Sequence, residues 1–235
     1  MLIDTLIIEK RYCGPDAVGN GGYVSGRLAR HVPGHVEVTL LMPVPLGENL
    51  PVYRRVDGQV ELTYREQVIA RARPAQLTLA VPPAPSLAEA RAAARRWSGQ
   101  YSHPAPNCFV CGPDRQDGLQ IFAGPVTGSP VVACPWTPAP ALAGADGQVA
   151  GEFIWAALDC PGAFAISKTG VPYVLLGRLT ARLESTVRPG EQLIASGWLI
   201  QEDGRKYHTG TALYRADGSV CAAAAGVWIR PRAAG

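Results

Sequence analysis

The pattern of apolar and polar positions predicts that the second half of the chain is built mainly from long strands. Between residues 174 and 185, apolar or small residues alternate with polar ones, which is typical of a half-buried strand. One face carries Leu175, Gly177, Leu179, Ala181 and Leu183, and the other carries Arg178, Thr180, Arg182 and Glu184. Further strands are expected near 117–122, 130–136, 191–201, 205–215 and 219–229, and a helix is expected from about Val149 to Asp159.

The first half of the chain has the same order of elements. A strand-like run from Thr5 to Tyr12 precedes a glycine-rich turn at 19–22 and a short helix to about His31. Strands are expected near 35–43, 50–57, 59–65 and 67–73. A Gly-Glu-x-Leu sequence at 47–50 recurs at 190–193, in the same place relative to the strands of each half. The interpretation is that both halves descend from one repeated unit.

The two halves are separated by a proline-rich break at 82–85. Ser86 and Glu89 follow it with the spacing of a capping box, which predicts a helix over about 87–97. We therefore expect an N-terminal unit at 1–81, a linker with a helix at 82–110 and a C-terminal unit at 111–235. One short helix followed by several long antiparallel strands indicates an α+β class, with a sheet that wraps the helix of each unit.

Three segments resemble hotdog-fold thioesterases. Residues 107–113 (NCFVCGP) with Gly118-Leu119, and the helix at 151–164 (GEFIWAALDCPGAF), resemble phenylacetate-type members, whose central helix places an acidic residue after a His-Gly-Gly turn. Residues 21–29 (GGYVSGRLA) resemble a helix start of two-hotdog acyl-CoA thioesterases. The resemblance implies a double hotdog that hydrolyses an acyl-CoA or another acyl thioester, with CoA as part of the substrate and no further cofactor.

Asp159 is the strongest catalytic candidate. It lies eight residues beyond Gly151, ~12 Å along a helix axis, so it cannot serve the N-terminus of its own helix. If the two helices pack antiparallel at ~8–10 Å, Asp159 lies beside the start of the first helix. There the backbone N–H groups of Gly21 and Gly22 are expected to bind the thioester carbonyl, next to Asn20, which replaces the family's His. Each half thus supplies one component of a single composite site.

The same register places Ala29 at the acidic position of the first half, and residues 150–152 where His-Gly-Gly would be, which favours one site over two. Pro161 must end or kink the second helix and leaves Asp159 in its last turn, where the helix dipole raises the pKa of an acid. The alternative is a structural Asp that bonds a loop. Whether Asp159 activates a water or attacks directly is left open.

Four further residues are candidates for contact with the substrate. Tyr23 and Trp155 are expected to line an acyl pocket, although aromatic residues at helical spacing more often belong to the core. Thr180 could orient a water or an acyl carbonyl, but an ordinary strand threonine is favoured. Glu152 shares the helix face of Asp159, yet an acid that complements the dipole of the first turn is the preferred interpretation.

Two cysteines and a histidine follow H-x4-C-x2-C spacing: His103, Cys108 and Cys111. They supply three possible zinc ligands and no obvious fourth, so no metal is expected and packed or loop-bracing thiols are preferred.

The charge and the hydrophobic pattern of the sequence argue against several classes of protein. The net charge of +3 and the absence of a basic run with interleaved aromatic residues argue against nucleic acid. No secretory signal and no 18-residue apolar window are present, so we expect a cytoplasmic protein with no membrane contact and with reduced thiols at all six cysteines.

Two alternative functions stay open: a non-catalytic acyl-CoA or lipid-binding module, and a dehydratase-like tailoring enzyme that acts on a thioester. Residues 219–229 carry no charge, so this strand is expected to lie inside the sheet or under another chain. Association into a homodimer of double hotdogs is the further expectation.

Overall fold

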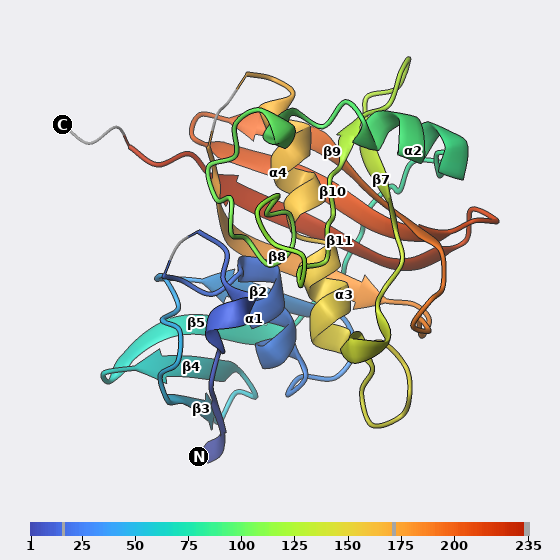
Figure 1. Cartoon of the computed structure of the whole chain (residues 1–235). Helices are drawn as coiled ribbons and strands as arrows, with labels where there is room; N and C mark the ends of the chain where they lie inside the picture. Colours follow the sequence, from blue (N-terminus) through green and yellow to red (C-terminus); the bar gives the residue numbers. More distant parts are fainter. Residues whose placement is uncertain (16, 171–172, 233–235) are drawn as a thin grey trace.

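The structure, a computed structural model, describes residues 1–15, 17–170 and 173–232. Its main feature is one antiparallel sheet of eleven strands within these residues (Figure 1). The strands are β1 (Leu2–Leu6), β2 (Val36–Leu40), β3 (Leu50–Arg54), β4 (Val60–Tyr64), β5 (Gln67–Pro74), β6 (Gly124–Pro125), β7 (Val132–Trp136), β8 (Leu175–Leu183), β9 (Leu193–Asp203), β10 (Lys206–Arg215) and β11 (Val220–Ile229). The α-helices are α1 (Gly21–Ala29), α2 (Leu87–Ala94), α3 (Gly151–Ala157) and α4 (Cys160–Ser167), and the 3₁₀ turns are η1 (Lys10–Tyr12), η2 (Ser98–Gln100) and η3 (Pro140–Leu142).

The order of strands in the sheet repeats between the two halves of the chain. From one edge the order is β1-β3-β4-β5-β2, and it continues as β8-β11-β10-β9-β7-β6. If the short edge strand β6 is left out and β7 to β11 are counted as the first to fifth strands of the second half, both halves have the order first, third, fourth, fifth, second from the outside inward. The halves meet where β2 pairs with β8, with Val36 opposite Ala181.

The repeat extends to the loops. Gly47 and Gly190 both have positive φ angles, 73° and 82°, which favour glycine in each Gly-Glu-x-Leu sequence. Their N–H groups donate to carbonyls that precede a 3₁₀ turn, Ile8 O and Pro138 O, both at 2.8 Å. Each sequence ends on the first residue of a third strand, β3 or β9. The two loops are therefore structurally equivalent.

Most of the expected strands are present, and two expectations are wrong. The strand near 117–122 is a loop, because the N–H groups of Leu119 and Ile121 donate to carbonyls of the 109–110 loop and not to a neighbouring strand. The run from Thr5 to Tyr12 is a strand only to Leu6 and ends in η1. The expected position of the last strand is confirmed, since β11 lies between β8 and β10.

The helix expected from Val149 to Asp159 is two helices with a kink between them. Helix α3 ends at Ala157, and α4 begins at Cys160 with Pro161 in its first turn. Asp159 forms the joint, with φ of −80° and ψ of −77°. A proline has no N–H for the preceding turn, so the expected break is confirmed. The chain nevertheless continues as a helix, which places Asp159 at the start of α4 as well as after α3.

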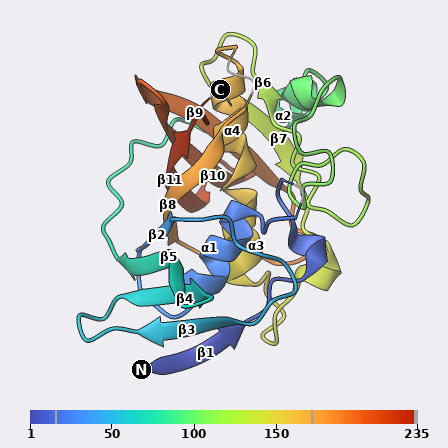
Figure 2. The same ribbon diagram turned by 90° about the vertical axis from the view of Figure 1, so that its left-hand side faces the viewer.

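Helices α1 and α3 pack antiparallel and in unusually close contact, and Figures 1 and 2 both show them side by side. Gly22 faces the α3 end at Trp155 and Asp159, whereas Gly26 faces its start at Glu152. A Cβ atom added to Gly22 would lie 2.6 Å from Asp159 Cβ, and one added to Gly26 would lie 2.5 Å from Glu152 Cα. The backbones of α1 and α3 lie so close together that only glycine fits at these two positions.

The connection between the halves covers the outer face of the second half's sheet. Leu77 and residues of α2 pack there against Trp198 and Tyr214. Tyr214 Oη donates to Pro82 O at 2.9 Å, and Arg182 donates to Leu77 O at 3.2 Å. The capping box of Ser86 and Glu89 is confirmed. Within the described residues, no helix combines the length and the apolar character that a membrane span requires.

The glycine contact gives a stability prediction. Gly26→Ala places a methyl group against the backbone of α3, so the free energy of unfolding should fall by about 1–2 kcal/mol although alanine favours helix. Gly151→Ala is the matched control, because it also adds a methyl group to a helix but meets nothing closer than Leu183 Cδ2 at 3.8 Å. Urea unfolding of both variants measures the difference. Equal stability of the two variants would contradict the packing described.

Candidate functional site

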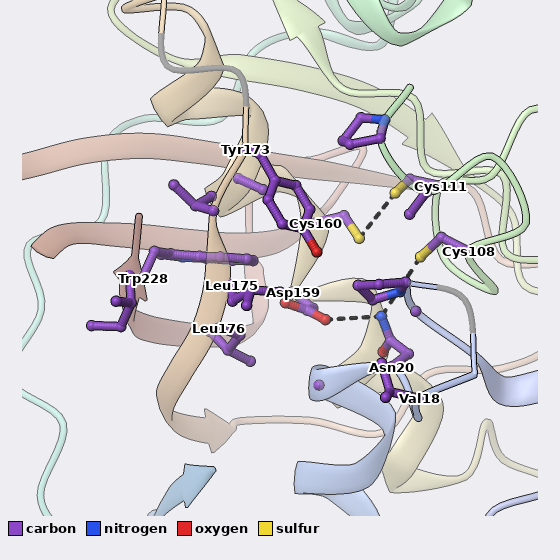
Figure 3. Close-up of a pocket in the computed structure, with 18 of the residues that line it drawn as sticks. Val18, Asn20, Cys108, Cys111, Asp159, Cys160, Tyr173, Leu175, Leu176 and Trp228 are labelled. Atoms are coloured by element: carbon purple, nitrogen blue, oxygen red, sulfur yellow. Dashed lines mark hydrogen bonds between the residues drawn. The ribbon is translucent and has the colours of Figure 1, made fainter. Parts of the chain in front are cut away.

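A cavity of about 760 Å³ lies beside the start of α1 and the start of α4. Most of its wall is apolar, with residues 40–44, residues 173–177 and the end of β11 among the lining segments. Its polar lining includes Asn20, His103, Asp159 and three cysteines, Cys108, Cys111 and Cys160. Figure 3 shows Asn20 directed toward Asp159 and Cys108, and Cys111 directed toward Cys160. No Lys or Arg is among the described residues of the wall.

Asp159 lies in the cavity wall and is bonded to the first helix. The residue is 3% exposed, and its Oδ2 accepts hydrogen bonds from Asn20 Nδ2 and from the Gly22 N–H, both at 2.9 Å. Its Oδ1 is buried and has no hydrogen-bond partner among the described residues. The structure therefore brings together Asp159 and the start of α1, with one carboxylate oxygen fixed and the other unpaired.

Asn20 uses both ends of its side-chain amide. Its Oδ1 accepts from the Tyr23 N–H at 2.9 Å and caps α1, while its Nδ2 donates to Asp159 and lies 3.8 Å from Cys108 Sγ. An amide offers an acceptor and two donors at fixed positions, so one buried residue caps the helix and orients the acid.

The two glycines expected to bind the substrate carbonyl are not equivalent. The Gly22 N–H is already bonded to Asp159, so the expectation of two free amides is wrong for Gly22. Gly21 lines the cavity, and its N–H has no acceptor among the described residues. One backbone donor is therefore available to a ligand.

Burial raises the pKa of Asp159 to about 7, against the hydrogen bond from Gly22, which lowers it. Asp159 follows the end of α3, as expected, but is also the N-cap of α4, whose dipole favours an anion and opposes the effect expected from the first helix end.

The four residues expected to contact the substrate lie outside the wall of this cavity. Tyr23 stacks on Tyr12 with ring centroids 4.0 Å apart, and its Oη accepts from Arg27 at 3.1 Å. Burial raises the pKa of Tyr23 to about 12. Trp155 is 4% exposed and packs against α1 at Gly26. Both aromatic residues thus serve the core between the helices.

Thr180 lies in the sheet, and Glu152 lies in the contact between α1 and α3. Thr180 lies in the middle of β8, opposite Glu37 of β2 and Ala225 of β11, away from the cavity. The backbone of Glu152 contacts α1 at Gly26, at the end of α3 remote from Asp159. Neither is in position to touch a ligand in the cavity.

Cys160 is a third partner of Cys108 and Cys111 that no motif in the sequence indicates. The three Sγ atoms lie within 4.8 Å of one another, and those of Cys111 and Cys160 are 3.1 Å apart. Cys160 lies 49 residues from Cys111, and no spacing in the sequence relates them. None of the six cysteines, all of which are described, forms a disulfide.

The fold is that of known hotdog proteins. A hotdog-fold protein of unknown function from Alicyclobacillus acidocaldarius is 10% identical, with a TM-score of 0.56 over 98% of this chain and 93% of that chain. A protein provisionally assigned as thioesterase II from Thermobifida fusca YX is 16% identical, with a TM-score of 0.66 over 97% and 93% of the two chains. A provisionally assigned thioesterase from Novosphingobium aromaticivorans DSM 12444 is 12% identical, with a TM-score of 0.65 over 97% and 95%.

At these identities the likeness shows the fold alone. No protein-family model matches the sequence, and no curated protein matches it significantly.

The bond between Asn20 and Asp159 can be tested by exchanging the two side chains. Asn20→Asp keeps a side chain that can cap α1, but it places a second buried carboxylate beside that of Asp159. The free energy of unfolding should therefore fall by about 2–3 kcal/mol. Adding Asp159→Asn restores a donor and an acceptor across the contact and should recover ~1–3 kcal/mol as a coupling energy. Chemical unfolding of the two single variants and the double variant gives this cycle; strict additivity would argue against the contact.

Proposed function

We propose that the protein hydrolyses an acyl thioester, with the acyl group in the cavity and Asp159 as the catalytic residue. The observation that carries the proposal is the unpaired Oδ1 of a buried carboxylate in the wall of an apolar cavity. Buried carboxylate oxygens normally find partners, so an unpaired oxygen on a residue of the cavity wall is the candidate to meet a water or a substrate carbon when a ligand binds.

The proposed mechanism uses the groups around Asp159 that are not already hydrogen-bonded within the protein. Asn20 and Gly22 hold Oδ2 and orient the carboxylate. The free N–H of Gly21 would donate to the thioester carbonyl and stabilise the oxyanion. Oδ1 would then take a proton from a water that attacks the carbonyl carbon, or attack that carbon itself. In the first route the C–O bond to water forms, the C–S bond breaks, and the proton that Oδ1 took passes to the leaving thiolate. In the second route Asp159 forms a mixed anhydride as the C–S bond breaks, and a water then hydrolyses the anhydride, which restores the carboxylate and supplies the proton of the thiol.

The cavity favours an acyl group over the phosphates of a carrier. Its wall is mostly apolar, and Asp159 is the only Asp, Glu, Lys or Arg among its described residues. An acyl-CoA would therefore place its acyl end in the cavity and its phosphates outside it. The thioesterase assignments of two of the structural neighbours support a thioester as the substrate class.

We also propose that the chain is a double hotdog with one active site. The repeated strand order and the equivalent glycine loops support two fused units. The equivalent N–H groups of Asn20 and Ala150 donate to Tyr12 O and Leu142 O, which aligns Gly22 with Glu152 and Ala29 with Asp159. The second potential site thus has neither the acid nor the capping amide.

The test is the loss of hydrolysis on Asp159→Asn. Across a panel of acyl-CoA thioesters, this variant should release CoA at least about 10²–10⁴-fold more slowly, because a primary amide is neither a base nor a nucleophile. Chromatographic quantitation of free CoA measures the rate. Asp203→Asn, at the exposed end of β9, should keep the parent's rate.

Other outcomes separate the alternatives. Full hydrolysis by Asp159→Asn would remove the proposal. Thermal stabilisation of the parent by acyl-CoA without CoA release would favour a binding module. A changed acyl group without free thiol would favour a dehydratase-like enzyme.

A further inference from the structure

Three buried thiols converge in the cavity wall, and we name Cys108, Cys111 and Cys160 the thiol trio. The residues are 4%, 4% and 7% exposed, and they come from two separate elements, the loop at 105–112 and the first turn of α4. Their sulfur atoms lie within 4.8 Å of one another. Figure 3 shows Cys111 and Cys160 directed toward each other, next to Cys108. From this convergence we propose that the thiol trio binds one zinc ion.

The distances suit a single ion. Zinc–sulfur bonds are about 2.3 Å long, so two thiolates on one tetrahedral zinc lie about 3.8 Å apart. The distances in the trio, from 3.1 Å to at most 4.8 Å, bracket this value. Thiolates select soft or borderline ions, which favours zinc over magnesium or calcium. Small rotations about the Cα–Cβ bonds would therefore complete the site.

One polar side chain already contacts the trio. Asn20 Nδ2 lies 3.8 Å from Cys108 Sγ and donates toward it. A donor beside a metal-bound sulfur orients that ligand, as partners of metal ligands generally do.

The loop at 105–112 is held rigidly in shape. The Gly112 N–H donates to Cys108 O at 2.8 Å, and a Cβ atom at Gly112 would lie 2.4 Å from Pro106 O. The Phe109 N–H donates to Cys13 O at 2.7 Å and fixes the loop to the first half of the chain. Ligand side chains on such a loop are positioned before the metal arrives, which favours binding.

His103 is placed as a support for the site and not as its fourth ligand. Its Nδ1 accepts a hydrogen bond from the Ala105 N–H at 3.0 Å, so the proton of the neutral ring is on Nε2. Nε2 lies 3.4 Å from Cys111 Sγ and donates to it. Partners of this kind orient metal ligands. The fourth position of the zinc then faces the cavity, where a water completes the tetrahedron.

The experiment uses the full chain, reduced and stripped of metal, without any substrate. Titration with Zn²⁺ should show one equivalent bound and a higher Tm, because the ion binds the folded state. Co²⁺, used as a spectroscopic substitute, should give the near-ultraviolet charge-transfer absorption of cobalt–thiolate bonds. Neither measurement depends on thioester hydrolysis, so this proposal and the proposed function can fail separately.

Variants locate the ion. Cys108→Ser, Cys111→Ser and Cys160→Ser should each weaken Zn²⁺ binding more than about 100-fold, whereas His103→Ala should weaken it only about 10–100-fold, the range for groups that support ligands. Cys221→Ala, a buried cysteine in β11, is the control and should bind like the parent. Circular dichroism of each variant confirms that it is folded.

Two results would overturn the proposal. One is the absence of zinc uptake and of the cobalt–thiolate band in the folded, reduced protein. The other is zinc uptake that Cys108→Ser, Cys111→Ser and Cys160→Ser leave unchanged, because the ion would then lie elsewhere.

Discussion

The site depends on the close antiparallel contact of α1 and α3. Helices usually pack ~8–10 Å apart, and bulkier residues at Gly22 and Gly26 would enforce such a distance. With glycine at both positions, the backbone of α1 lies against the backbone of α3. This approach lets the Gly22 N–H and Asn20 reach Asp159 across the helix pair. A packing requirement of the core therefore also sets the hydrogen bonds of the carboxylate.

The sequence predicted the elements better than their chemistry. Alternation and glycine turns located nine of the eleven described strands within a few residues, and the register of Gly151 and Asp159 placed the acid beside Asn20 and Gly22. What it could not predict depends on contacts between distant segments. The role of Gly22 was wrong because only packing determines which acceptor reaches its N–H. Cys160 was missed because the kink before α4 turns it toward a loop 49 residues earlier.

The repeated strand order lets the two halves be compared position by position, and they contribute different parts of the site. At the position equivalent to Gly22, the second half carries Glu152, whose backbone contacts α1 at Gly26. At the position equivalent to Asp159, the first half carries Ala29, which is buried in the core. An alanine there avoids the cost of burying a second carboxylate without donors. Both helices therefore keep their packing, but the polar groups of a site are complete only where the start of α1 meets Asp159.

The kink at Asp159 couples the acid to the thiol trio. Because Pro161 breaks the helix, the peptide between residues 159 and 160 leaves regular geometry and directs two consecutive side chains to the cavity wall. Asp159 is then held by α1, and Cys160 lies against the 105–112 loop. A zinc ion on Cys160 would fix the first turn of α4, and with it the backbone that carries the carboxylate. Asn20 makes a second link, since its Nδ2 contacts both Asp159 and Cys108. The orientation of the Asp159 carboxylate would thus depend on the occupancy of the trio as well as on the helix pair.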